Sequence, residues 1–288
     1  MKLWWLMMVG MLCQGLRAQS VAPYEVQVTG QGEDILFIPG LNCHGDVWAE
    51  TVAALSGEYR CHVFTLAGFA GVPPLAEGPY LDRYEEAIME YVETEGLEGV
   101  TVVGHSLGGY LTLRLGLRNE AAVARLVVVD ALPFLPGVWN PAAQEGMDTV
   151  RLQQYITSLD TLAPEALRGV RMQSARGLCQ DSTAWEGIVN WAMASEVRTE
   201  AHAVFEMTAT DLRQELAGIG VPLLMLAPAM AEDAATVERF RQMYAQQYAA
   251  APHLDLRMVA PAGHFIMLDE PDIFLQALQD FVGGPQVD

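Results

Sequence analysis

Short apolar runs alternate with longer segments of helical spacing over the first half of the chain. Runs rich in β-branched residues predict strands at residues 24–28, 35–38, 62–66, 100–103 and 126–129. Segments with apolar positions every three to four residues predict helices at residues 46–55, 81–94 and 108–117. Strands that alternate with helices pair in parallel, in a sheet that helices cover on both faces. This half of the chain therefore predicts an α/β fold.

The alternation is interrupted once. Residues 133–217 show no strand pattern, and their apolar positions recur at helical spacing. The earlier pattern then resumes, with strands expected at residues 221–226 and 254–259 and helices at residues 234–249 and 271–281. We expect residues 19–132 and 218–288 to form the core, and residues 133–217 to form a helical cap, inserted before the penultimate strand as a lid over the carboxyl edge of the sheet. The alternative is that residues 133–217 form a second domain with a function of its own.

The stretch that follows the central strand carries the strongest chemical signal. An apolar run, Val100 to Val103, ends in Gly104-His105-Ser106-Leu107-Gly108, and a helical segment begins at once. A strand, a tight turn and a helix with a serine at the apex form the context of a nucleophile elbow. The two glycines let the strand and the helix approach each other closely. Because a serine hydroxyl is a poor nucleophile at neutral pH, Ser106 would need a base within hydrogen-bond reach.

The first residues have the pattern of a secretory signal peptide. Lys2 gives a short positive start, Leu3 to Leu12 is apolar, and cleavage after Ala18 would leave Gln19 as the first residue. The apolar run is too short to span a bilayer. Residues 1–18 therefore predict a periplasmic or secreted protein, and an uncleaved interfacial anchor is the alternative. No later stretch has the length and apolarity of a membrane span.

Composition disfavours some partners. The chain has 288 residues, 51% of them hydrophobic, and a formal net charge of −20. Lys2 is its only lysine, so nucleic acid and anionic membrane surfaces would be repelled. Cleavage would leave Cys43, Cys61 and Cys179, an odd number, and we expect no essential disulfide. No cysteine or histidine spacing indicates a metal site, and the oligomeric state stays open.

Five local features together resemble the α/β-hydrolase family. They are Phe37-Ile38-Pro39-Gly40-Leu41, the elbow, the strand that ends in Asp130, the re-entry Asp211-Leu212 to Val221-Pro222, and Gly263-His264-Phe265 followed by Glu270-Pro271. The resemblance covers roughly residue 24 to the carboxyl terminus. It implies a mostly parallel central sheet with helices on both faces, a helical cap, and an enzyme that needs no cofactor or metal.

The resemblance also implies catalytic roles. Ser106 would be the nucleophile and His264 the base, because His264 alone of the six histidines follows the last strand. Many relatives carry the acid after the penultimate strand, where this chain has Glu232 and Asp233. Others carry it after the strand that follows the elbow helix, where this chain has Asp130. We expect Asp130 to orient the imidazole, with Asp233 or Glu232 as the alternatives.

Backbone and apolar groups would complete the site. The N–H groups of Leu41 and Leu107 would form the oxyanion hole, although Pro39-Gly40 replaces the His-Gly that is frequent in the family. Several aromatic and methionine side chains are candidates for an apolar substrate pocket, although most are expected in the core. They are Phe69, Trp139, Trp185, Trp191, Met193 and Phe265. Of these, we expect Phe265 and Trp139 to contact substrate.

These features predict a serine hydrolase that cleaves a small-molecule carboxylic ester through an acyl-serine intermediate. A second interpretation keeps the triad and changes the bond to a lactone, a thioester, an amide or a carbon–carbon bond. A third is a non-catalytic ligand-binding protein that kept the fold. Fold alone does not decide among them.

Overall fold

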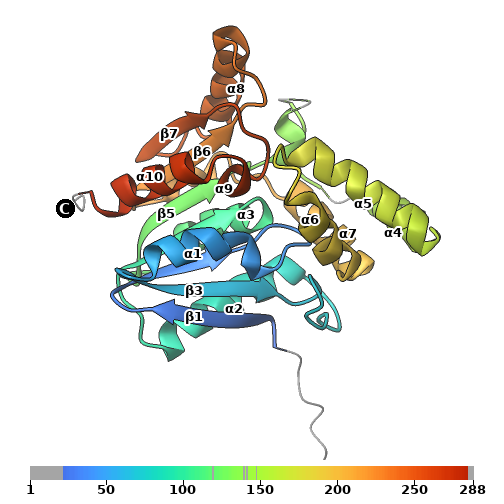
Figure 1. The fold of residues 1–288 in the computed structure, drawn as a ribbon, viewed down its shortest axis with the longest axis horizontal. Helices are drawn as coiled ribbons and strands as arrows, with labels where there is room; N and C mark the ends of the chain where they lie inside the picture. The colour runs from blue at the N-terminus through green and yellow to red at the C-terminus, as the bar shows by residue number, and fades with distance from the viewer. Residues whose placement is uncertain (1–21, 119, 139, 141, 147, 285–288) are drawn as a thin grey trace, which may run out of the picture.

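A seven-stranded sheet forms the centre of the molecule in the computed structural model (Figure 1). The structure describes residues 22–284 except 119, 139, 141 and 147. The strand order is β1-β3-β2-β4-β5-β6-β7. Strand β1 is antiparallel to β3, and the other pairs are parallel. The mostly parallel sheet predicted from the sequence is therefore confirmed.

The strands lie close to their predicted positions. They are β1 (Tyr24–Gly30), β2 (Glu33–Ile38), β3 (Tyr59–Leu66), β4 (Val100–His105), β5 (Val123–Val129), β6 (Leu223–Pro228) and β7 (Leu254–Val259). The helices around them are η1 (Gly45–Trp48), α1 (Ala49–Leu55), α2 (Tyr80–Thr94), α3 (Leu107–Leu117), α8 (Ala234–Gln247), α9 (Ile266–Asp269) and α10 (Pro271–Val282). Strand β3 begins earlier than expected because its first residues already pair with β1 and β2. The short helix α9 was not expected.

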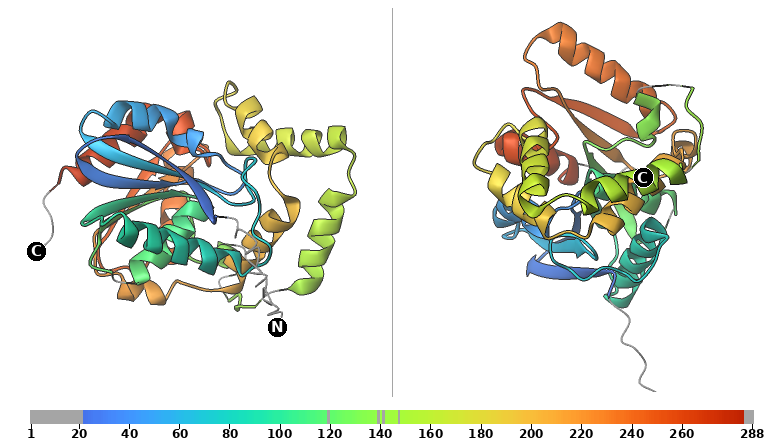
Figure 2. Two further views of the ribbon diagram at one scale, coloured as in Figure 1. Left: turned by 90° about the horizontal axis from the view of Figure 1, so that it is seen from below. Right: turned by 90° about the vertical axis from the view of Figure 1, so that its right-hand side faces the viewer.

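Two apolar layers enclose the sheet, because alternate side chains of each strand point to opposite faces. On one face, Leu55 of α1 and Phe274 of α10 belong to the same buried cluster as Phe37 of β2. On the other face, Tyr84 of α2 and Tyr110 of α3 are buried against the sheet. The left view of Figure 2 shows α1 and α10 on one side of the sheet and α2 and α3 on the other.

A helical cap connects β5 to β6. It contains η2 (Leu135–Val138), α4 (Thr149–Asp160), α5 (Pro164–Leu178), α6 (Trp185–Met193), α7 (Val197–Ala209) and η3 (Glu215–Gly218). Figure 1 shows α4 to α7 beyond the carboxyl ends of the parallel strands. The Glu206 carboxylate of α7 accepts the free N–H groups of Tyr80 at 3.0 Å and Leu81 at 2.8 Å, at the start of α2. This contact fastens the cap to the core.

Other predictions from the sequence concern the first residues, the cysteines, a membrane span and a metal site. The predicted signal peptide, residues 1–18, and Trp139 lie outside the described residues. Cys43, Cys61 and Cys179 are buried free thiols, and burial raises the pKa of Cys43 to about 12. Within the described ranges, no helix combines the length and apolarity needed to cross a bilayer. In the same ranges, no three His, Cys, Asp or Glu side chains are grouped to hold a metal ion.

Candidate active site

Ser106 occupies a strained turn between β4 and α3. Its φ is 55° and its ψ is −116°, a conformation that residues other than glycine rarely adopt. Its N–H donates to the Val129 carbonyl at 3.0 Å, which ties the turn to β5. A Cβ atom on Gly104 would lie 2.1 Å from the Gly108 carbonyl oxygen, and one on Gly108 would lie 2.2 Å from the Ile38 carbonyl oxygen. Glycine is therefore required on both sides of the serine.

This crowding predicts a stability effect. Gly108→Ala should lower the free energy of unfolding by about 3 kcal/mol, because the new methyl group forces α3 away from the backbone at the end of β2. Gly187→Ala in α6 is the matched control: no atom lies within 4 Å of its added Cβ, and it should raise stability by about 0.5–1 kcal/mol. Urea denaturation measures both variants. A Gly108→Ala protein as stable as wild type would contradict the close approach of helix and strand.

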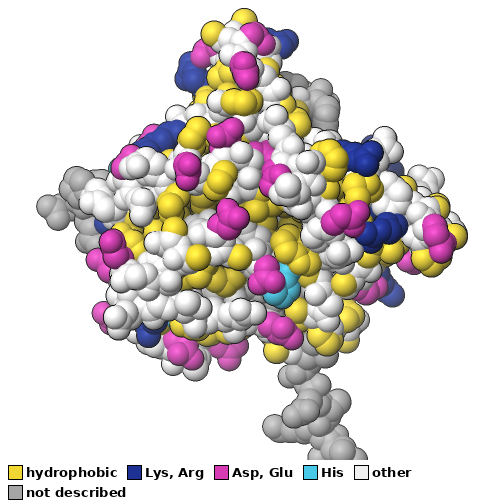
Figure 3. All heavy atoms as spheres, viewed as in Figure 1, with side chains coloured by type: hydrophobic (Ala, Val, Ile, Leu, Met, Phe, Trp, Pro, Cys, Tyr) yellow, Lys and Arg dark blue, Asp and Glu magenta, His cyan; other side chains and the backbone are white. Residues whose placement is uncertain are grey.

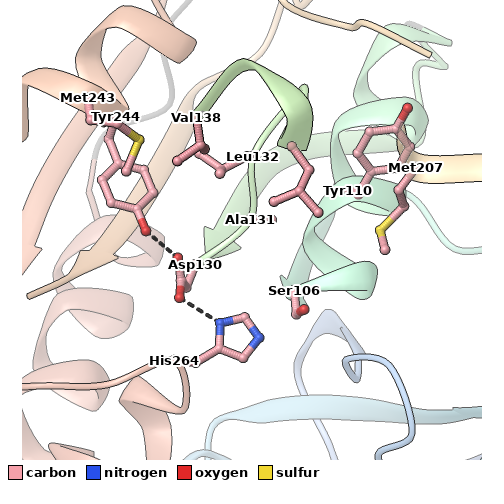
Figure 4. Close-up of a pocket in the computed structure, with 11 residues that line it drawn as sticks. Ser106, Tyr110, Asp130, Ala131, Leu132, Val138, Met207, Met243, Tyr244 and His264 are labelled. Atoms are coloured by element: carbon pink, nitrogen blue, oxygen red, sulfur yellow. Dashed lines mark hydrogen bonds and ion pairs between the residues drawn. The ribbon is translucent and has the colours of Figure 1, made fainter. Parts of the chain in front are cut away.

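His264 follows β7 and meets Asp130, which follows β5. The imidazole Nδ1 lies 2.6 Å from the Asp130 Oδ2. Figure 4 shows the ring between Asp130 and Ser106, with Nδ1 turned to the carboxylate and the other ring nitrogen on the side of Ser106. Among the described residues, no hydrogen bond joins the Ser106 hydroxyl to the ring. Such bonds are often long until substrate binds.

The two alternative acids lie elsewhere. Asp233 is exposed and caps α8, where its side chain accepts the Thr236 N–H at 2.9 Å. Glu232 precedes it and is also exposed. In the described chain, neither carboxylate is hydrogen-bonded to His264. The structure thus brings Asp130, and not these residues, to the imidazole.

The sequence did not indicate the tyrosine that holds Asp130 from the other side. Tyr244 of α8 donates its hydroxyl to the Asp130 Oδ1, while His264 binds the Oδ2. Burial, with the Asp130 charge as a second cause, raises the pKa of Tyr244 well above its ordinary value. The phenol therefore stays protonated and donates. Residues 130 and 244 meet only because α8 packs against the sheet, and no local motif signals such a contact.

His105 supports the backbone of the loop that carries His264 through a hydrogen bond. Its Nε2 donates to the His264 carbonyl oxygen at 2.9 Å, and the two ring centroids are 4.5 Å apart. Burial lowers the pKa of His105 well below its ordinary value, and the nearby His264 charge acts in the same direction. His105 is therefore neutral, with its proton assigned to Nε2 by this bond.

The neutral state of His105 predicts a loss of stability in acid. An unfolded histidine has a pKa of about 6.5, so below this pH the unfolded state binds a proton that the native state excludes. The His105 contribution is complete above pH ~6.5, and it falls by about 1.4 kcal/mol for each pH unit below. Denaturation by urea at pH 7.5 and pH 5.0 should show a smaller difference for His105→Asn than for wild type. Equal differences would contradict this account.

The backbone N–H groups of Leu41 and Leu107 are the candidates for an oxyanion hole. Leu107 is the first residue of α3, where an N–H has no partner within the helix. Gly40 lies against the elbow, since a Cβ there would be 3.1 Å from the Ser106 Cβ, and Leu41 follows it. Among the described residues, neither the Leu41 nor the Leu107 N–H donates to another backbone group. Free donors beside a nucleophile can bind a developing oxyanion.

A cavity of about 290 Å³ opens beside Ser106. Most of its lining is apolar, and Figure 4 shows how the side chains surround it. Beside Ser106, Asp130 and His264, the lining residues are Tyr110, Ala131, Leu132, Leu135, Val138, Met207, Met243 and Tyr244. Met207 comes from cap helix α7 and Met243 from α8, so the cap and the core both contribute walls. Neither lysine nor arginine is among these described lining residues.

Phe265, which was expected to contact substrate, lies outside the cavity lining. Phe265 is only 3% exposed and packs on His105, with ring centroids 4.9 Å apart. It lies in the core because the chain turns inward directly after His264, so its position gives no support to a substrate contact. Phe69 is also fully buried. Trp185, Trp191 and Met193 belong to α6, outside the cavity lining.

The chain carries more acidic than basic side chains, 36 Asp and Glu against 16 Lys and Arg. Figure 3 shows magenta side chains spread over core and cap, and dark blue ones mainly on the cap and near the tip that carries α8. Several arginines are paired with acidic neighbours, such as Arg168 with Glu186 and Arg241 with Glu238. Anionic partners therefore meet a surface of their own charge sign.

Comparison with known proteins places these features in context. The sequence model of the Alpha/beta hydrolase family matches residues 35–277. The pimeloyl-(acyl-carrier protein) methyl ester esterase of Vibrio cholerae is 26% identical over 259 residues, which cover 88% of this chain and 96% of that protein. The 3-oxoadipate enol-lactonase 1 of Acinetobacter baylyi is 23% identical over 91% of this chain and 93% of that protein.

Solved structures agree on the fold. The esterase EaEST from Exiguobacterium antarcticum superposes with a TM-score of 0.74 at 19% identity. The superposition covers 91% of this chain and 96% of that one. This likeness shows the fold that the sequence predicted.

Proposed function

The chain belongs to the alpha/beta hydrolase family, and from that premise we propose that it is a serine hydrolase acting on a carboxylic ester. One observation carries the proposal: Ser106 and His264 line the same cavity as Asp130, whose carboxylate binds the imidazole at 2.6 Å. A nucleophile, a base and a group that orients the base are the parts that acyl transfer requires.

The proposed reaction has two steps. The Ser106 hydroxyl attacks the ester carbonyl carbon and passes its proton to the free ring nitrogen of His264, and Asp130 stabilises the imidazolium. The Leu41 and Leu107 N–H groups bind the oxyanion until the alcohol leaves with the proton from His264. A water molecule, deprotonated by His264, then attacks the acyl-serine carbonyl carbon. The bond to the Ser106 oxygen breaks, that oxygen takes the proton back from His264, and the carboxylic acid is released.

The cavity favours an uncharged substrate with an apolar acyl or alcohol group. Its walls offer methionine, leucine and valine side chains, and Asp130 is the one acidic residue among the lining residues that the structure describes. A substrate carboxylate buried there would meet no cationic partner and a like charge, which is unfavourable. The names of the relatives support acyl chemistry in general and leave the bond and the substrate open.

A panel of p-nitrophenyl esters of graded chain length tests the proposal. We expect turnover of short and medium acyl chains, and a kcat/KM at least about 100-fold lower for an ester of equal length that ends in a carboxylate. Equal kcat/KM values for the neutral and the charged ester would contradict the preference for an uncharged substrate. Lack of turnover across the panel, with turnover of a lactone, thioester or amide instead, would replace the ester by that bond.

A further inference from the structure

Asp269 connects two parts of the molecule that lie far apart in the sequence. It is the last residue of α9, and its carboxylate is only partly exposed. One oxygen, Oδ2, accepts the Gly263 N–H at 2.7 Å, directly before His264. The other, Oδ1, accepts the N–H groups of Gln180 at 2.8 Å and Asp181 at 3.0 Å. A single side chain thus joins the His264 loop to the turn between cap helices α5 and α6.

The backbones that Asp269 joins are also in direct contact. A Cβ atom on Gly263 would lie 2.5 Å from the Leu178 carbonyl oxygen at the end of α5. The Cys179 thiol adds a bond to the Asp269 Oδ1 at 3.2 Å, and the Trp185 indole holds the Cys179 carbonyl at 2.8 Å. The turn after α5 is therefore fixed on α6, and the His264 loop rests on that turn.

The cap residues that Asp269 connects to the His264 loop do not line the cavity. None of the residues from 178 to 181 lines the cavity, whose cap contributions come from η2 and α7. His264 has three attachments: its imidazole binds Asp130, its carbonyl accepts from His105, and its preceding N–H is held by Asp269. Neither of the first two attachments reaches the cap, and the Asp269 carboxylate joins the loop to the turn after α5.

We propose that Asp269 is a positioning residue, whose carboxylate holds the His264 loop against the cap so that the imidazole stays aligned with Ser106. The inference rests on the proposed serine hydrolase function. Asp269 sets the position of the base, whereas other segments build the cavity walls that bind substrate.

The test compares Asp269→Asn and Asp269→Ala with wild type. The Asn amide retains one acceptor oxygen, so it keeps the bond either to the Gly263 N–H or to the N–H groups of Gln180 and Asp181. Ala loses the bonds to both segments. Because small misplacements of a reacting group are costly, we expect kcat to fall about tenfold for Asn and about 100-fold for Ala. The KM for a p-nitrophenyl ester should stay within about threefold, because the cavity walls are unchanged. The rate of labelling by a small fluorophosphonate should fall in parallel with kcat.

Asp272→Asn, an exposed carboxylate in the first turn of α10, is the matched control and should match wild type. Thermal unfolding of each variant shows whether it is folded, and if Ala is not, the isosteric Asn decides the test. Wild-type labelling by folded Asp269→Asn, or a loss confined to KM, would overturn the positioning role. A wild-type protein that is not labelled at all would instead overturn the proposed function.

Discussion

Ser106→Ala is expected to abolish labelling by a fluorophosphonate and to lower kcat for a p-nitrophenyl ester by about 10⁶-fold. The Ser106 hydroxyl is the group that forms the acyl bond, and alanine fits into the space that serine leaves. The left-handed conformation at residue 106 is already imposed on a residue with a Cβ. Labelling is read by mass spectrometry and activity by release of nitrophenol.

Ser158→Ala is the control for this experiment. Ser158 lies on the exposed face of α4, where its hydroxyl donates to the Tyr155 carbonyl at 2.7 Å, far in the sequence from the elbow. The variant should be labelled at the wild-type rate. Labelling that persists in Ser106→Ala would assign the nucleophile to another residue. A wild-type protein that resists the probe would favour a ligand-binding protein without catalysis.

Asp130→Ala should lower kcat by about 10⁴-fold, because the imidazole loses the group that orients it and stabilises its charge. Asp130→Asn should lose less. Its amide oxygen can still accept from His264, since the Tyr244 hydroxyl that now donates to the carboxylate can turn and accept from the amide NH₂. Steady-state kinetics on the same ester measures both variants.

Asp233→Asn provides the comparison for the acid. The amide oxygen retains the cap on α8, and we expect stability and kcat close to wild type. If Asp233→Asn lowered kcat as much as Asp130→Ala, the carboxylate that orients His264 would be Asp233, which follows β6. A mild effect of Asp130→Ala would have the same meaning.

Local patterns in the sequence account for most of the frame. The strands and the elbow were predictable because β-branched runs favour strands and glycines permit tight turns, and both effects depend only on residues close in the sequence. Asp130 was predictable as a residue at the end of a strand, since parallel strands bring their carboxyl ends to one edge. Its preference over Asp233 became decisive only with the contact to His264.

Contacts between distant segments could not be predicted. Tyr244 reaches Asp130 and Asp269 joins α5 to the His264 loop through packing that no spacing rule describes. The prediction for Phe265 came from its place beside His264, but the chain turns inward there and buries the ring. Met207 and Met243 line the cavity from two helices whose mutual position follows from the whole fold.

The bond between Tyr244 and Asp130 constrains how this scaffold can be recombined. A chimera that takes α8 from a homologue without the tyrosine leaves one oxygen of the Asp130 carboxylate without its protein donor. The strand β5 and the helix α8 therefore form one unit of exchange, although more than 100 positions separate their paired residues. Libraries built by domain shuffling should keep these two segments from the same parent.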